Sequence, residues 1–103
     1  MVTQYKNLIN GEMVGTAKTL DVVNPANEEV IGQVPACGED ELNQAVAAAR
    51  AAFKSWSKTP IDERRKVVQA IAGVINENND ELFRLLTAEQ GKPHAQAQGE
   101  IAG

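Results

Sequence analysis

The chain has 103 residues, with ten Lys or Arg against fourteen Asp or Glu and a formal net charge of −4. This length allows one small domain that buries roughly 60 to 65% of the surface its unfolded chain exposes. The negative charge and the scattered basic residues argue against a nucleic acid or an anionic membrane as partner.

No apolar run approaches the ~20 residues of a transmembrane helix, and the first residues show no signal-peptide pattern. The single cysteine, Cys37, cannot form an internal disulfide and fits a reducing compartment. We therefore expect a cytoplasmic protein.

Residues 6–34 carry two signals for short β-hairpins. Asn10-Gly11 stands between the apolar pairs Leu8-Ile9 and Met13-Val14, which is the strongest short hairpin pattern. Further along, the runs 20–23 and 30–34 flank a turn at residues 24–27 that contains a proline. Two small hairpins are expected.

From Gly38 onward the apolar spacing becomes helical. Apolar residues recur at intervals of three and four: Leu42, Ala45, Val46, Ala49, Phe53 and Trp56. A second helix is predicted from Thr59 as N-cap and Pro60 as first helical residue to about Asn78.

A third helix is expected after residues 78–80, which can cap it. Its leucines 82, 85 and 86 should face inward, and Asp80 should pair with Arg84 on the surface. Gly91, in the left-handed conformation, and Pro93 should end it. Residues 94–103 are helix formers in which no apolar face is established, so three or four helices follow the hairpins.

Several blocks of the sequence, in this order, resemble the beginning of an NAD(P)-dependent aldehyde dehydrogenase. The blocks are Asn7–Glu12, Val22–Ala26, Glu29–Pro35, Ala45–Trp56 and Leu86–Pro93. The Glu-Gln-Gly-Lys-Pro ending, followed by residues 97–101, is similar to the succinate-semialdehyde dehydrogenase branch of that family.

The resemblance implies that residues 1–103 form the N-terminal part of a Rossmann-like nucleotide-binding domain, with hairpins at 6–34 and helices at 39–103. The fold class is then α/β in the parent enzyme and α+β for the isolated chain. Such an enzyme oxidises an aldehyde to a carboxylate with NAD or NADP. The family's nucleophilic cysteine, general-base glutamate, oxyanion asparagine and cofactor loop would all lie downstream of Gly103. We therefore expect the chain alone to be inactive and to bind no cofactor.

Two residues of catalytic type are not expected to act in catalysis. Cys37 precedes three acidic residues at positions 39–41, which oppose the thiolate that a nucleophile requires. His94 has no second His or Cys at metal-ligand spacing and should face solvent. The glycines at 11, 15, 32 and 38 form no phosphate-binding motif and are interpreted as turn formers.

Glu89 is the residue to which the resemblance gives a site. Some family members bind a structural Na⁺ or K⁺ through a main-chain carbonyl before the Asn-Pro turn and an acidic side chain in this helix-ending segment. The corresponding residues here are Val22 and Glu89. The alternative is that Glu89 is merely solvated or pairs with Lys92.

Two short hairpins need something to pack on, and in a complete enzyme the helices should also cover a sheet that these residues do not encode. Some apolar helix surface should therefore remain uncovered. A homo-oligomer is therefore expected, with faces formed by Leu42, Val46 and Phe53, or by Ile71, Ile75 and Leu82, packed across subunits. The alternative function from another class is a non-catalytic helical interaction or self-association module.

Overall fold

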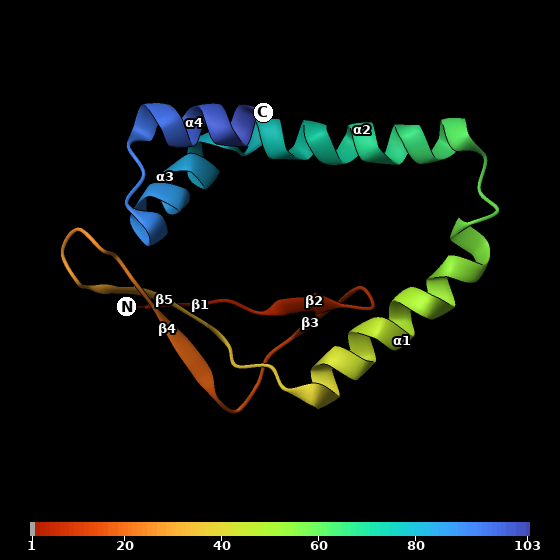
Figure 1. The fold of residues 1–103 in the computed structure, drawn as a ribbon, viewed down its shortest axis with the longest axis horizontal. Coiled ribbons are helices and arrows are strands. Elements are labelled where there is room, and N and C mark those ends of the chain that lie inside the picture. Colours follow the sequence, from red (N-terminus) through yellow and green to blue (C-terminus); the bar gives the residue numbers. More distant parts are fainter. Residues whose placement is uncertain (1) are drawn as a thin grey trace. The chain divides into compact units, whose positions relative to one another are not determined.

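A computed structural model describes residues 2–103 (Figure 1). The strands are β1 Thr3–Gln4, β2 Asn7–Ile9, β3 Glu12–Val14, β4 Thr19–Val23 and β5 Val30–Pro35. The helices are α1 Glu39–Trp56, α2 Ile61–Glu77, α3 Asn79–Gln90 and α4 His94–Ala102. Strands followed by helices are the α+β arrangement predicted for the isolated chain. No helix in residues 2–103 is long and apolar enough to cross a membrane.

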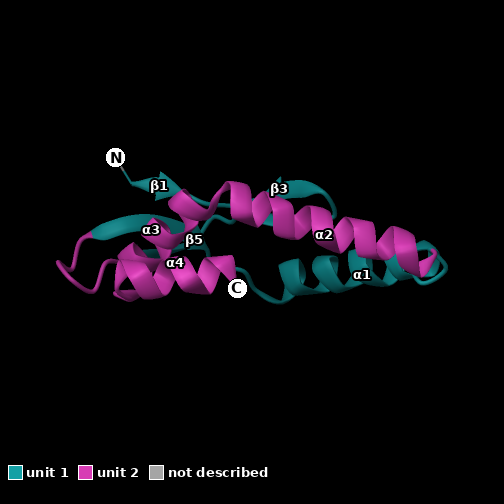
Figure 2. Ribbon diagram, turned by 90° about the horizontal axis from the view of Figure 1, so that it is seen from above, with its two compact units in different colours: residues 1–22, 30–59 teal, residues 23–29, 60–103 magenta. Residues whose placement is uncertain are grey.

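The chain groups into two compact units, coloured separately in Figure 2. Unit 1 holds the chain up to Val22 together with Val30–Thr59, and unit 2 holds Val23–Glu29 together with Pro60–Gly103. Unit 1 therefore contains most of the strands and α1. Unit 2 contains α2, α3 and α4 together with the turn between β4 and β5.

The first predicted hairpin is present in unit 1. Strands β2 and β3 pair antiparallel, with Leu8 opposite Met13 and Ile9 opposite Glu12. The turn residues Asn10 and Gly11 have φ values of 53° and 77°. Positive φ at both central residues is what a type I′ turn requires, and Asn-Gly supplies it at little steric cost.

The second predicted strand pair is present within a larger sheet. Its strand order is β1-β5-β4, and β1 pairs parallel to β5 with Thr3 opposite Gly32. The Tyr5 N–H extends this pairing by donating to the Gln33 carbonyl at 2.8 Å. The strand β1 was not predicted, because two residues are too few to show an alternating pattern.

Helix α1 begins and ends close to its predicted limits. The Glu41 carboxylate accepts a hydrogen bond from the Gly38 N–H at 2.9 Å, which satisfies one donor just before the first turn. Phe53 is 65% exposed and Leu42 is 61% exposed. The predicted amphipathic helix is present, but the rest of the described chain leaves most of its apolar face open.

The start of α2 differs from the prediction. Pro60 has an extended ψ of 145°, so the helix begins at Ile61 and Pro60 is its N-cap residue. The Thr59 hydroxyl donates to the Ser55 carbonyl at 3.3 Å. The N-cap role predicted for Thr59 is therefore wrong, because its side chain bonds back to the end of α1.

The core of unit 2 lies between α3 and α4. Phe83 is 6% exposed and Ala97 is fully buried, while the leucines at 82, 85 and 86 are only half-buried. The edge of the His94 ring meets the Phe83 ring at a centroid distance of 5.4 Å. The predicted pair between Asp80 and Arg84 is confirmed at 3.3 Å.

The predicted end of α3 is confirmed. Gly91 has φ 85°, and its N–H donates to the Thr87 carbonyl at 2.8 Å. Pro93 then adopts an extended conformation as N-cap residue of α4, which begins at His94. Left-handed Gly91 thus ends one helix two residues before the proline that opens the next.

Candidate functional site

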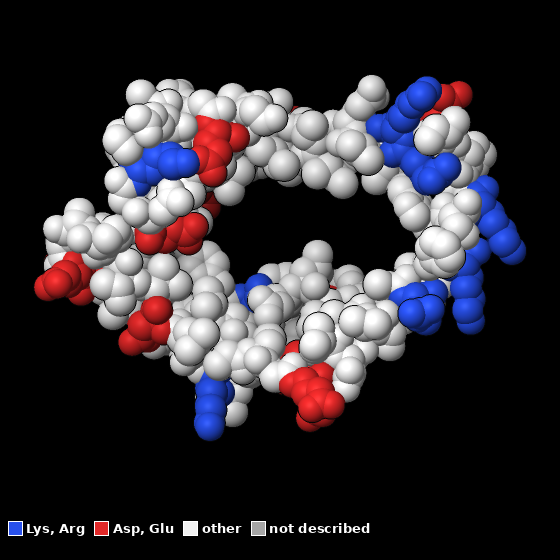
Figure 3. Space-filling view, viewed as in Figure 1, with Lys and Arg blue, Asp and Glu red and all other residues white. Residues whose placement is uncertain are grey.

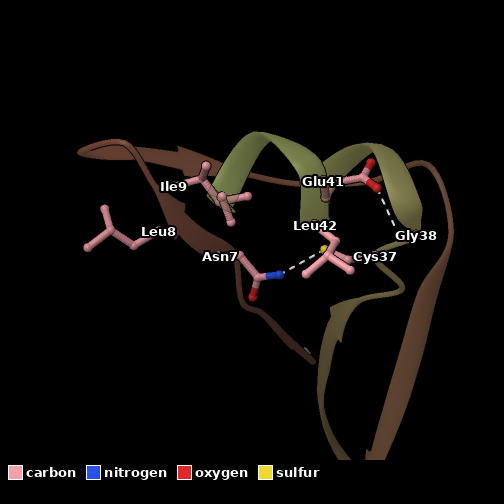
Figure 4. Close-up of a pocket in the computed structure, with 8 residues that line it drawn as sticks. Asn7, Leu8, Ile9, Cys37, Gly38, Glu41 and Leu42 are labelled. Atoms are coloured by element: carbon pink, nitrogen blue, oxygen red, sulfur yellow. Dashed lines mark hydrogen bonds between the residues drawn. The ribbon is translucent and has the colours of Figure 1, made fainter. Parts of the chain in front are cut away.

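Cys37 lies in a hollow of unit 1 between β2 and the first turns of α1 (Figure 4). The hollow has a volume of about 610 Å³. Its lining residues are Asn7, Leu8, Ile9, Cys37, Gly38, Glu41, Leu42 and Ala45. The thiol is free and exposed, and Cys37 Sγ accepts a hydrogen bond from Asn7 Nδ2 at 2.8 Å. It is the one nucleophilic side chain in this lining.

Two polar side chains, Asn7 and Glu41, line the hollow together with the thiol, and neither suits it for nucleophilic catalysis. The Asn7 amide nitrogen that faces Sγ is a donor and cannot take the thiol proton. The backbone hydrogen bond from Gly38 lowers the pKa of Glu41 below its ordinary value of 4.5, so this carboxylate is ionised at neutral pH and is a weak base. The geometry thus supports the interpretation of Cys37 as a non-catalytic thiol, which stays a prediction.

His94 lies at the start of α4 and is exposed, as predicted. Its ring contact with Phe83 has an interplanar angle of 73°, which is an edge-to-face arrangement. Residues 2–103 contain no group of three His, Cys, Asp or Glu side chains placed to hold a metal ion. The observed contact of His94 is thus with Phe83, which joins α4 to α3.

Val22 and Glu89, the pair suggested for a monovalent cation, belong to different units. Val22 is half-buried near the end of β4, and Glu89 is exposed in the last turn of α3. Lys92, the alternative partner of Glu89, pairs instead with Glu100 of α4. The predicted pairing of Glu89 with Lys92 is therefore wrong, whereas the other alternative, a solvated Glu89, agrees with its exposure. The cation site stays a prediction.

The glycines of unit 1 offer no cradle for a dinucleotide. Gly11 is in the β2–β3 turn, and Gly38 precedes α1. The interpretation of Gly32 as a turn former is wrong, because this residue is buried in β5. A Cβ at Gly32 would lie 2.8 Å from Tyr5 Cε2. The described residues therefore do not fit a phosphate-binding loop for NAD or NADP.

Comparison with known proteins identifies the class to which these elements belong. The family model described as "Aldehyde dehydrogenase family" matches residues 13–103. This chain therefore belongs to the aldehyde dehydrogenase family, and the resemblance found in the sequence is confirmed.

The sequences of individual relatives are similar to this chain over nearly its whole length. Malonate-semialdehyde dehydrogenase 1 of Geobacillus thermodenitrificans is 44% identical over 97% of this chain and 21% of its own length. The NADP⁺ succinate-semialdehyde dehydrogenase GabD of Escherichia coli is 41% identical over 92% of this chain and 20% of its own.

Similarity extends to the backbone. The crystal structure of an NAD-dependent aldehyde dehydrogenase from Sinorhizobium meliloti matches 99% of this chain and 21% of that chain, with a TM-score of 0.93 and 36% identity. The chain thus spans about a fifth of the length of the proteins it matches.

Proposed function

We propose that this chain forms the N-terminal part of an enzyme that oxidises an aldehyde to a carboxylate with NAD or NADP. The observation that carries the proposal is the 44% and 41% identity, over 97% and 92% of the chain, to enzymes named for two semialdehydes. Cofactor use is proposed from one relative named as NAD-dependent and another named with NADP⁺.

The proposed substrate is a short semialdehyde that carries a carboxylate. The resemblance found in the sequence leads us to expect succinate semialdehyde. Malonate semialdehyde is a second member of the same chemical class, since relatives are named for it. Each of these compounds has an anionic group a few atoms from its carbonyl carbon. Recognition of that anion would fall to residues beyond those of this chain.

Within such an enzyme, the proposed role of this chain is structural. The Cys37 hollow presents no group suited to accept the thiol proton, and the described glycines form no dinucleotide loop. We therefore propose that residues 1–103 frame a nucleotide-binding domain, and that this chain alone binds no cofactor and is inactive. The cytoplasmic location expected from the sequence stays a prediction.

The cation site and the oligomeric state are parts of the same proposal. The Val22 carbonyl and the Glu89 carboxylate would be oxygen ligands for Na⁺ or K⁺, which prefer such atoms. Self-association is supported by the exposed apolar faces of α1 and α2. These faces also favour the second candidate function, a non-catalytic interaction module.

A chimera tests the proposed function. This chain replaces the region it matches in E. coli succinate-semialdehyde dehydrogenase, and reduction of NADP⁺ is followed with succinate semialdehyde. The same enzyme with the region deleted is the control. Activity in the chimera and none in the deletion supports the proposal. A folded but inactive chimera, or turnover by the isolated chain that Cys37→Ser abolishes, contradicts it.

A further inference from the structure

Asn10 is the one asparagine of the chain that is followed by a glycine. It is exposed at the tip of the β2–β3 hairpin in unit 1. A Cβ placed on Gly11 would meet no atom of another part of the chain within 4 Å. The peptide nitrogen of Gly11 is therefore next to the Asn10 side chain in the sequence and is not shielded by a side chain from elsewhere.

This pair of residues allows a ring-closing reaction. When a base removes the Gly11 amide proton, this nitrogen can form a bond to Asn10 Cγ, and the side-chain nitrogen takes up a proton and leaves as ammonia. The product is a cyclic succinimide. Water then opens the ring at either of its carbonyl carbons, which gives aspartate or isoaspartate. Water is the only co-reactant, and asparagine is among the thermolabile residues of proteins.

The other asparagines are held or blocked. Asn7 Nδ2 donates to Cys37 Sγ at 2.8 Å, and the Asn27 amide is held by two hydrogen bonds within its own turn. Asn24 precedes a proline, whose nitrogen carries no proton. Within residues 2–103, the Asn10 side chain has no hydrogen-bond partner. The remaining asparagines lie in helices or cap one, at positions 43, 76, 78 and 79.

The hairpin must open before the ring can close. A type I′ turn gives its first central residue a ψ of about +30°, which directs the Gly11 nitrogen away from the Asn10 side chain. Strands β2 and β3 have three residues each, and most of these residues are exposed. A two-stranded hairpin is marginally stable at best. Ring closure should therefore occur in the fraction of chains whose hairpin is open.

We propose that Asn10 is a modification site at which the chain converts itself to aspartate and isoaspartate, and that isoaspartate separates β2 from β3. Isoaspartate carries the main chain through its Cβ, so the turn gains one methylene group. The two-residue turn fixes the pairing of Leu8 with Met13, and a longer turn does not fit that register. Aspartate leaves the main chain unchanged, and Asp-Gly also suits a type I′ turn.

Either product replaces a neutral amide with a carboxylate. Figure 3 shows acidic side chains gathered at the beginning of α1, which belongs to the same unit. The new charge adds to the formal net charge of −4 of the original chain. Anion exchange can therefore separate the modified chains from the original one.

The test keeps the full 103-residue chain in mildly alkaline buffer and follows each asparagine by mass spectrometry of its peptides. An isoaspartyl methyltransferase distinguishes isoaspartate from aspartate. Asn10 should convert about tenfold or more faster than Asn27, whose two hydrogen bonds must break first. Both products should appear, because they come from one ring. Asn10→Gly keeps a residue pair that suits the turn and should gain no charge there.

NMR then compares the hairpin of the purified isoaspartate form with that of freshly prepared Asn10→Asp. The nuclear Overhauser contact between Leu8 and Met13 should be lost in the isoaspartate form and kept in Asn10→Asp. Equal rates of conversion at Asn10 and Asn27, or aspartate without isoaspartate, overturns the modification site. A contact between Leu8 and Met13 that survives in the isoaspartate form overturns the effect on the hairpin.

Discussion

A methyl group placed on Gly91 would lie 3.1 Å from Cγ of Pro25. These residues come from the end of α3 and from the turn between β4 and β5, and both belong to unit 2. Gly91 also has φ 85°, a backbone conformation that residues with a Cβ rarely adopt. The position thus requires glycine for its backbone conformation and for its close approach to the turn.

Gly91→Ala should destabilise unit 2. The left-handed conformation costs an alanine about 1–2 kcal/mol, and the contact with Pro25 adds to that loss. The measurement is the free energy of unfolding in urea. Gly91→Asn should lose less, because asparagine tolerates this conformation. Gly99→Ala, where the new Cβ meets no atom within 4 Å in α4, should stabilise by about 0.5–1 kcal/mol. Equal effects at the two positions would contradict this account.

Gly32→Ala tests the β1–β5 pairing in unit 1. The new Cβ would lie 2.8 Å from Tyr5 Cε2 and 3.4 Å from the Thr3 carbonyl oxygen. Because Tyr5 is 41% exposed, its ring can turn away, so we expect a loss near the lower end of the ~1–3 kcal/mol typical of overpacking. NMR of the ring of Tyr5, the single tyrosine, should show the displacement.

The control for Gly32→Ala is the same change combined with Tyr5→Ala. Removing the ring removes the main clash, so the glycine substitution should cost less in that background. Additive free energies would mean that Tyr5 does not restrict this position.

Glu41→Gln should weaken the beginning of α1. The hydrogen bond from the Gly38 N–H lowers the pKa of Glu41 in the folded chain below the value of 4.5 that it has when unfolded. The ionised carboxylate therefore stabilises the fold above that unfolded pKa, and this contribution is lost as the pH falls through the lowered folded pKa. Circular dichroism at neutral pH should show less helix in Glu41→Gln.

The pH dependence provides the check on Glu41. Between neutral pH and strong acid, the difference in helicity between the original chain and Glu41→Gln should shrink as the carboxylate of the original chain is protonated. Glu39→Gln, also in the first turn, is the matched control at neutral pH and should lower the helicity less, because the Gly38 N–H bonds to Glu41. A difference that stays constant below pH 4.5 would show that the Glu41 charge is not involved.

Features that depend on local chemistry could be predicted from the sequence. Asn10-Gly11 specifies its turn because few residue pairs adopt positive φ at two successive positions. Gly91 and Pro93 likewise specify the end of α3 through their own backbone properties. Gly91 readily adopts the left-handed conformation, and Pro93 lacks the N–H that a continuing helix needs.

Features that depend on distant partners could not be predicted. Phe83 rather than the neighbouring leucines is the buried side chain of α3, because the packing of α4 decides which side of α3 is covered. The contact of Asn7 with Cys37 joins residues 30 positions apart, and no local pattern signals it. Lys92 has Glu89 as a neighbour in sequence but Glu100 as its partner in the fold.

The α1 face tests self-association. Phe53 is 65% exposed and Val46 is 52% exposed, and covering such side chains is worth roughly 1.5–3 kcal/mol each. We expect sedimentation to show an oligomer that Phe53→Glu weakens. Ser55→Glu, which adds the same charge on the other side of α1, should leave the oligomer intact. A monomer at all concentrations, with no binding of a hydrophobic dye, would contradict the proposed oligomer.

The cation proposal predicts a specific effect of salt. Glu89 places a negative charge in the last turn of α3, where the helix dipole disfavours it by a few tenths of a kcal/mol or more. A bound Na⁺ or K⁺ would offset this cost and raise the melting temperature through its preference for the folded state.

Melting is compared in sodium, potassium and choline chloride at equal ionic strength, so that general screening is constant. Glu89→Gln should abolish the difference between the salts, whereas Glu81→Gln, at the start of the same helix, should preserve it. Identical melting of the original chain in all three salts would remove Val22 and Glu89 as a cation site.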